Sequence, residues 1–240
     1  MIVRDEGETF LLITQPDHAR LAEQIVGRMR TEPALESADR DVILLATREH
    51  DNGWIEVDAD PTIEPGTGRP RDFMIGPAAV KHDLWLRGIA RAAKMNLRAG
   101  ALVAEHALTV YGYRRGTAAW QSFFESVTAL RDDLLQQLGI VGRPSRDAFE
   151  QQYRCVQLAD ALSLQFCQGS PERNATLDYE ATMQEDRLIV SPDPFGGGTV
   201  ALRILGRRIP ARRYHDDGEL RDTLAAAIPI VVEGNAKGVW

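Results

Sequence analysis

The feature that most constrains the fold is a repeat of apolar residues at helical spacing, which recurs through the first 170 residues. Apolar positions follow one another three or four residues apart, as the buried stripe of an amphipathic helix requires. Thr14 and Pro16 suit the start of the first segment, and Ser145 can cap the last. Gly53 can supply a left-handed residue that ends the second. The spacing predicts helices over residues 16–29, 37–51, 77–95, 98–111, 117–138 and 145–167.

The remaining segments have the alternation and turn signals of short strands. Near the start, IVR and FLLIT flank the turn-like DEGE, which predicts a short N-terminal hairpin. After residue 170, the β-type stretches LIVS, TVALRIL and IPIVV are separated by PDPFGGG and YHDDGE. We therefore expect a mainly α fold, in which a helical bundle carries a short N-terminal hairpin and a small β-rich C-terminal appendage. The expected domains are residues 1–170 and, packed on them, residues 175–240.

The charge balance bears on the partners of the chain. With 28 basic and 35 acidic residues the net charge is −7, which argues against nucleic acid or an anionic membrane as the main partner. A small anionic substrate is still compatible, because a metal or a few arginines can supply local positive charge. No apolar run reaches the length of a membrane span, and the start lacks the pattern of a signal peptide. Cys155 and Cys167 form no CxxC pattern, which is typical of reduced thiols and favours the cytoplasm.

Four of the five histidines lie on the apolar stripe of a predicted helix, one on each of the first four helices. The late Asp160 lies in the middle of another stripe, within LADALSLQF, where a lone carboxylate would be costly without a partner or a metal. Imidazoles and carboxylates that converge from several helices are how bundle cores hold metals, and such mixed ligands suit Fe, Mn, Zn, Co or Ni. Taken singly, each inward histidine is more often a core residue that bonds a carbonyl. The four histidines are His18, His50, His82 and His106.

The order of these residues resembles the HD-domain superfamily of metal-dependent phosphohydrolases. The matching elements are His18, the His50-Asp51 doublet of REHDNGW, and Asp160 in ADALSLQ. The resemblance implies a helical bundle in which these four residues bind a divalent metal ion. His82 and His106 stand where the phosphodiesterase and oxygenase-like branches place two further histidines, which implies a second ion. The segments QPDHARLA, REHDNGW and TGRPRDF also make most of the chain similar to an uncharacterised bacterial family, a resemblance that implies no activity.

The resemblance implies a reaction in which a metal-activated water attacks a small phosphate ester or nucleotide-like substrate. Asp51 would be catalytic and could turn its carboxylate between two ions. Asp17 could orient His18 or act as a base, although an acidic residue in the first turn of a helix is at least as ordinary.

The predicted substrate-binding residues are Trp54, Arg48, Arg71 and Lys81, each of which could equally be a packing or surface residue. Trp54 stands where many relatives carry a lysine, which departs from the pattern of the best-known branches. Two alternatives stay open at this point. One is an HD-type di-iron oxygenase that uses all six ligands, and the other is a metal-containing binding or regulatory module without catalysis. A homo-oligomer is compatible with each of them.

Overall fold

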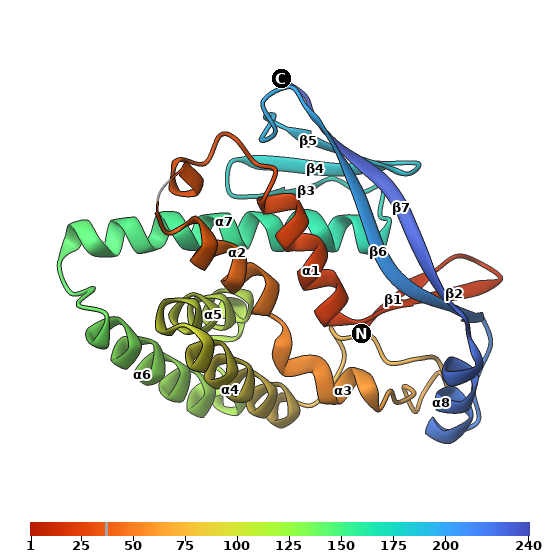
Figure 1. Ribbon diagram of the computed structural model, residues 1–240. Helices are drawn as coiled ribbons and strands as arrows, with labels where there is room; N and C mark the ends of the chain where they lie inside the picture. Colours follow the sequence, from red (N-terminus) through yellow and green to blue (C-terminus); the bar gives the residue numbers. More distant parts are fainter. Residues whose placement is uncertain (37) are drawn as a thin grey trace.

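The computed structural model describes residues 1–36 and 38–240. Six long helices lie where the apolar repeats predict them, and the loops between them contain shorter turns of helix (Figure 1). The predicted start of the second helix, Ser37, lies outside the described residues. The long helices are α1 (Gln15–Val26), α2 (Arg40–Glu49), α4 (Ala78–Met95), α5 (Leu97–Val110), α6 (Gln121–Gln137) and α7 (Arg143–Gln168). The shorter ones are η1 (Pro33–Glu36), η2 (Asn52–Trp54), α3 (Ile55–Ala59), η3 (Gly112–Arg114) and η4 (Ala118–Trp120). A further helix, α8 (Asp217–Ala226), lies between β6 and β7.

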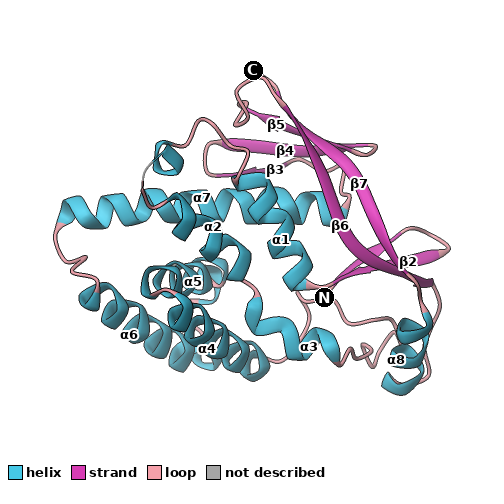
Figure 2. Ribbon diagram, in the orientation of Figure 1, coloured by secondary structure: helices cyan, strands magenta, loops and turns pink. Residues whose placement is uncertain are grey.

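All named strands belong to one seven-stranded sheet, in the order β1-β2-β6-β7-β5-β4-β3. Neighbouring strands are antiparallel except β5 and β7, which are parallel. The sheet is long and curled, with α1 and α7 against one side of it, while α8 lies apart from the other helices near β2 (Figure 2). The strands are β1 (Ile2–Asp5), β2 (Thr9–Ile13), β3 (Asn174–Thr176), β4 (Tyr179–Gln184), β5 (Arg187–Ser191), β6 (Thr199–Pro210) and β7 (Pro229–Gly238).

The predicted fold class is therefore wrong, because the hairpin and the C-terminal strands are one structure. Strand β2 pairs with β6 in the register Thr9↔Pro210 to Leu12↔Arg207, which joins the two ends of the chain. The β-structure is neither a small appendage nor a separate hairpin. Alternation along a strand indicates that one of its faces is buried, but it does not indicate which distant strand will pair with it. The proposed division near residues 170–175 stays a prediction.

Helices and sheet share one hydrophobic core. Strand β6 alternates buried and exposed residues, and its buried Val200, Leu202 and Ile204 belong to the same cluster as Ile25 of α1 and Phe166 of α7. Helix α5 packs against α2, α4, α6 and α7, so the centre of the helical layer is filled from several directions. A second, smaller cluster lies under α8 and contains Met1, Phe10, Leu12, Ile209, Tyr214 and Leu220. None of the helices in the described ranges combines the length and apolar character needed to cross a bilayer.

Candidate metal centre

Four helices bring five of the predicted metal ligands together. His18 comes from α1, His50 is the residue that ends α2, and Asp51 follows it directly. His106 comes from α5 and Asp160 from α7. Ligand atoms of His18, His50 and Asp51 lie within 4.8 Å of one another, and so do those of His50, His106 and Asp160. The three histidines are at most 2% exposed, so the cluster is part of the protein interior.

A close crossing of two glycines positions the His-Asp doublet. Gly53 follows it in η2, and a Cβ on Gly53 would lie 2.8 Å from the carbonyl carbon of Leu84 in α4 and closer still to its oxygen. Gly88, one turn further along α4, approaches Gly53 from the other side, because a Cβ there would lie 3.1 Å from the Gly53 nitrogen. Gly53 is not in the left-handed conformation, so the predicted role as a helix-ending left-handed residue is wrong. A glycine is needed at position 53 because the backbone of η2 comes too close to the backbone of α4 to leave room for a Cβ. This close contact fixes the position of the doublet against α4.

The hydrogen bond of His50 indicates which ring nitrogen is free. Nδ1 lies 2.7 Å from the carbonyl oxygen of Thr47, so Nδ1 must carry the proton and donate it. Nε2 is buried, has no hydrogen-bond partner in the described chain, and lies 3.4 Å from a carboxylate oxygen of Asp51 and 3.4 Å from one of Asp160. An imidazole held through Nδ1 with its Nε2 directed at carboxylates is the usual arrangement of a metal ligand.

His18 is held in the same tautomer by a serine. Ser163 Oγ donates to the backbone oxygen of Asp160 at 3.0 Å, which uses its only proton. It therefore accepts from Nδ1 of His18, 2.9 Å away. Nε2 of His18 then faces the carboxylates, at 2.9 Å from Asp160 and 3.8 Å from Asp51. The Nε2 lone pairs of His18 and His50 thus face the carboxylates of Asp51 and Asp160. Such an arrangement requires positive charge between the groups, either protons or a metal ion.

The electrostatics of the cluster favour positive charge. Burial lowers the pKa of His50, but Asp51 and Asp160 outweigh burial and raise it well above its ordinary value. Burial raises the pKa of Asp160, but the hydrogen bond to His18 and the proximity of His50 and His106 hold it well below its usual range. Burial lowers the pKa of His106 to about 4, with partial opposition from Asp160, so this imidazole is neutral at pH 7. Three imidazoles and two carboxylates could thus hold a divalent metal ion.

His82 does not join the cluster. Its ring stacks on Phe123 at 5.1 Å between centroids and meets Trp120 edge-on at 4.8 Å. The buried face of α4 runs through Lys81, Leu84, Trp85, Gly88, Ile89 and Ala92, and it shares only Ile89 with the predicted stripe of His82, Leu86, Ile89 and Ala93. The helix is rotated relative to that prediction, so Trp85 faces His106 in place of His82. The ligand set proposed for a second metal is thereby incomplete.

A pocket of about 410 Å³ opens onto the cluster. His18, Asp51, His106 and Asp160 are among its lining residues. The walls are mainly aromatic and are formed by Trp54, Phe73, Trp85, Tyr111 and Tyr113. Polar groups are contributed by Gln15, Gln168, Lys81 and Arg114. The predicted substrate-binding residues Trp54 and Lys81 therefore do lie in the pocket, 27 positions apart in the sequence.

The two cations of the pocket have no acidic partner. Lys81 is buried and donates from Nζ to the backbone oxygen of Met74 at 2.8 Å, while the exposed Arg114 lies over the Tyr113 ring. Neither forms an ion pair with any carboxylate among residues 1–36 and 38–240. Burial and the nearby Arg114 lower the pKa of Lys81. The pocket thus combines a carboxylate-rich cluster with unpaired positive charge on its wall.

Other predicted site residues are used elsewhere. Asp17 accepts from Thr14 Oγ at 2.7 Å and pairs with Arg20 at 2.6 Å, and it lines a different pocket. Arg48 is exposed and pairs with Glu49 and Glu23. Arg71 donates to the backbone oxygen of Ile63 and pairs with Glu64.

The sequence-based prediction missed several residues of the pocket, including Gln15, Trp85, Tyr111 and Arg114. The run YGYRR at 111–115, which directly follows the His106 helix, was the available signal, because aromatic residues and arginine are enriched at binding surfaces. Gln15 Oε1 is also buried without a hydrogen-bond partner in the structure's described residues.

Fold and site together define a mixed helix-and-sheet protein with a buried histidine–aspartate cluster that could hold a metal ion at the end of an aromatic pocket. The chain belongs to the family described as protein of unknown function (DUF3891), whose sequence profile matches residues 1–211. This confirms the resemblance to an uncharacterised family. The matched range contains the whole cluster and the strands up to β6. No curated protein and no solved structure matched the chain.

Proposed function

We propose that the protein is a metal-dependent phosphohydrolase of the HD type that acts on a small phosphate ester, with a nucleotide-like compound as the best-fitting class. The observation that carries this proposal is the juxtaposition of the histidine–aspartate cluster with two unpaired cations in one pocket. A cluster of this kind binds a divalent ion, and unpaired lysine and arginine side chains bind phosphoryl oxygens. HD-domain membership is part of the proposal and rests on the order of the ligands in the sequence.

The residues that would hold the metal are His18, His50, Asp51 and Asp160, with His106 as a fifth donor on the same cluster. When bound, the ion would supply a Lewis acid and a water of lowered pKa. The chain itself keeps the donors in place. The backbone oxygen of Thr47 and Oγ of Ser163 accept the hydrogen bonds that hold the tautomers of His50 and His18, and loss of the Ser163 hydroxyl would free the His18 ring to rotate.

The pocket walls would orient the substrate. Lys81 is the buried cation and Arg114 the exposed one, so the first would contact the phosphoryl group inside the pocket while the second attracts it at the rim. Trp54 is held edge-on by Phe73 with 6.4 Å between ring centroids, which gives the pocket a rigid aromatic wall. Aromatic walls of this kind suit a planar base or ring attached to the phosphate.

The position of His82 distinguishes between the alternatives. The di-iron oxygenase requires all six predicted ligands, and the second ion would need His82 beside His106. His82 instead packs on Trp120 and Phe123. The geometry therefore supports hydrolysis with one resident ion better than oxygen chemistry with two.

The test combines metal content with turnover. The purified protein is analysed for bound metals and assayed with p-nitrophenyl phosphate and bis-p-nitrophenyl phosphate in the presence of Mn, Co, Ni, Zn or Fe. We expect about one ion per chain, metal-dependent hydrolysis of one ester, and loss of both in His50→Ala and Asp160→Asn. The matched control is His215→Ala, whose side chain is 90% exposed and lies outside the cluster. Two irons per chain with oxygen-sensitive absorption would support the oxygenase, and metal binding without turnover of any phosphate ester would support a binding module.

A further inference from the structure

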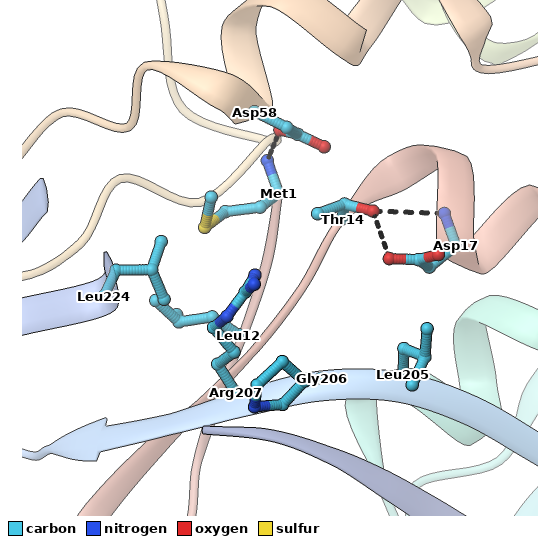
Figure 3. A pocket seen from close by; sticks show the side chains of 10 residues that line it. Met1, Leu12, Thr14, Asp17, Asp58, Leu205, Gly206, Arg207 and Leu224 are labelled. Carbon is cyan, nitrogen blue, oxygen red and sulfur yellow. Dashed lines mark hydrogen bonds and ion pairs between the residues drawn. The ribbon is translucent and has the colours of Figure 1, made fainter. Parts of the chain in front are cut away.

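A second pocket lies on the other side of the first turn of α1. It has a volume of about 240 Å³ and is enclosed by the start of α1, the hairpin strands, β6, β7 and α8 (Figure 3). Asp17 lines this pocket, whereas the next residue, His18, lines the pocket of the metal centre. The second pocket therefore takes no part in the function proposed above. Its lining residues are Met1, Leu12, Thr14, Asp17, Asp58, Leu205, Gly206, Arg207, Leu224 and Pro229.

Arg207 brings an unpaired charge into this pocket. Its side chain extends from β6 toward the side of the hollow where Met1 and Thr14 lie (Figure 3). Nε of Arg207 is buried and has no hydrogen-bond partner in the described structure, and the guanidinium forms no ion pair with any described carboxylate. A guanidinium that lines a pocket without a carboxylate partner can bind an anion from outside the described residues, so such a partner is expected.

The two carboxylates in the pocket wall already have partners. Asp17 accepts from Thr14 and pairs with Arg20. Asp58 accepts from the backbone nitrogen of Gln15 at 2.6 Å and pairs with the amine of Met1. Each negative charge is thus balanced by a neighbouring positive group. Arg207 is left as the single unbalanced charge of the lining residues.

The rest of the wall is apolar. Leu12, Leu224 and Pro229 close the pocket around Arg207, and Leu205 is 52% exposed beside it. The volume lies just below the range of roughly 300–1,000 Å³ of sites for drug-sized ligands, so the ligand is small. One guanidinium matches one carboxylate through two parallel hydrogen bonds. A phosphate dianion fits less well, because there is only one cation and two carboxylates lie in the same wall.

We propose that this pocket binds a small monocarboxylate with a short apolar body, whose carboxylate pairs with Arg207 and whose body packs on the leucines. The proposal does not depend on the metal centre, and its test is carried out without any activity measurement.

The test is a calorimetric titration of the full-length protein with sodium butanoate and hexanoate, and with hexanol and hexyl phosphate as probes of the head group. We expect saturable binding of hexanoate, weaker binding of butanoate, and no binding of hexanol. Arg207→Gln should weaken hexanoate binding at least tenfold, because the charged pair is lost. The matched control is Arg203→Gln on the same strand, whose guanidinium pairs with Glu233 at the surface and should leave binding unchanged.

A second variant tests the proposal in case Arg207→Gln fails to fold. Leu205→Trp places a large ring at an exposed position of the rim and should block the pocket while thermal melting stays unchanged. Absence of saturable hexanoate binding, or equal binding by Arg207→Gln and the wild-type protein, would overturn the proposal. Tighter binding of hexyl phosphate than of hexanoate would overturn the assignment to carboxylates.

Discussion

The glycine crossing behind the His-Asp doublet gives a prediction that can be worked out from distances. Alanine at position 53 would place Cβ 2.8 Å from the Leu84 carbonyl carbon and 3.4 Å from the Gly88 nitrogen. These are backbone atoms inside a helix, so no side chain can rotate away, and η2 must move off α4. Overpacking of this kind costs typically 1–3 kcal/mol, and the rigid neighbours place Gly53→Ala at the upper end, about 3 kcal/mol.

The predicted loss should be visible in thermal melting. For a protein of this size, about 1 kcal/mol changes Tm by roughly 2–4 °C, so Gly53→Ala should melt roughly 6–12 °C below the wild-type protein. The doublet ends two residues before Gly53, so the same displacement should weaken metal binding about 10- to 100-fold, as for the loss of a group that orients metal ligands. Melting is followed by circular dichroism and metal binding by titration of the metal-free protein.

The matched control is Gly66→Ala. A Cβ on Gly66 meets nothing within 4 Å, and the residue does not have a positive φ, so the change should stay within about 0.5 kcal/mol. A Gly53→Ala protein that melts within 2 °C of the wild type, with unchanged metal affinity, would show that the crossing does not position the doublet.

The other predictions concern the cluster and the pocket. Ser163→Ala leaves the Nδ1–H of His18 without an acceptor and should lower metal affinity about 10- to 100-fold in a metal titration, whereas Ser122→Ala, at an exposed position of α6, serves for comparison. Lys81→Met should reduce kcat/KM for the hydrolysed ester about 10- to 100-fold, mainly through KM, since it removes about 1.5–3 kcal/mol of charged hydrogen bonding; an unchanged KM would place the phosphate elsewhere. In the metal-free protein, His106 has a pKa of about 4 against an ordinary value of 6.5, so below pH 6.5 the unfolded chain takes up a proton that the folded chain does not. The resulting contribution to stability is present above pH 6.5 and should fall by about 3 kcal/mol between pH 6.5 and 4, which urea denaturation of wild type and His106→Gln at several pH values can measure.

The helices could be predicted from the sequence because their signal is local. A stripe at spacings of three and four identifies the helix and most of its buried face, and it placed His18, His50, His106 and Asp160 on inward faces. The same signal failed at His82. On α4 several neighbouring positions are apolar, so stripes that start at His82 and at Lys81 fit the sequence equally well, and packing against α5 decides between them.

The sheet could not be predicted as a whole because its pairing is between distant segments. The sequences of β1 and β2 predict a complete hairpin, and nothing in residues 2–13 indicates that β2 also pairs with β6. The pocket walls have a similar origin. Phe73 and Met74 come from the loop before α4, and Arg114 comes from the turn after α5, so only the folded chain brings them together.

The distance along the chain between the cluster residues also has a consequence for biosynthesis. His18 and Asp160, which meet at 2.9 Å, are 142 positions apart. A nascent chain therefore lacks the Asp160 carboxylate until α7 has left the ribosome and docked, so the cluster is completed late in synthesis. A chain that stops before α7 would contain His18, His50 and Asp51 but would lack the carboxylate that meets both histidines. If the cluster binds a metal ion as proposed, pulse-labelled protein should retain that ion only after α7 has been synthesised.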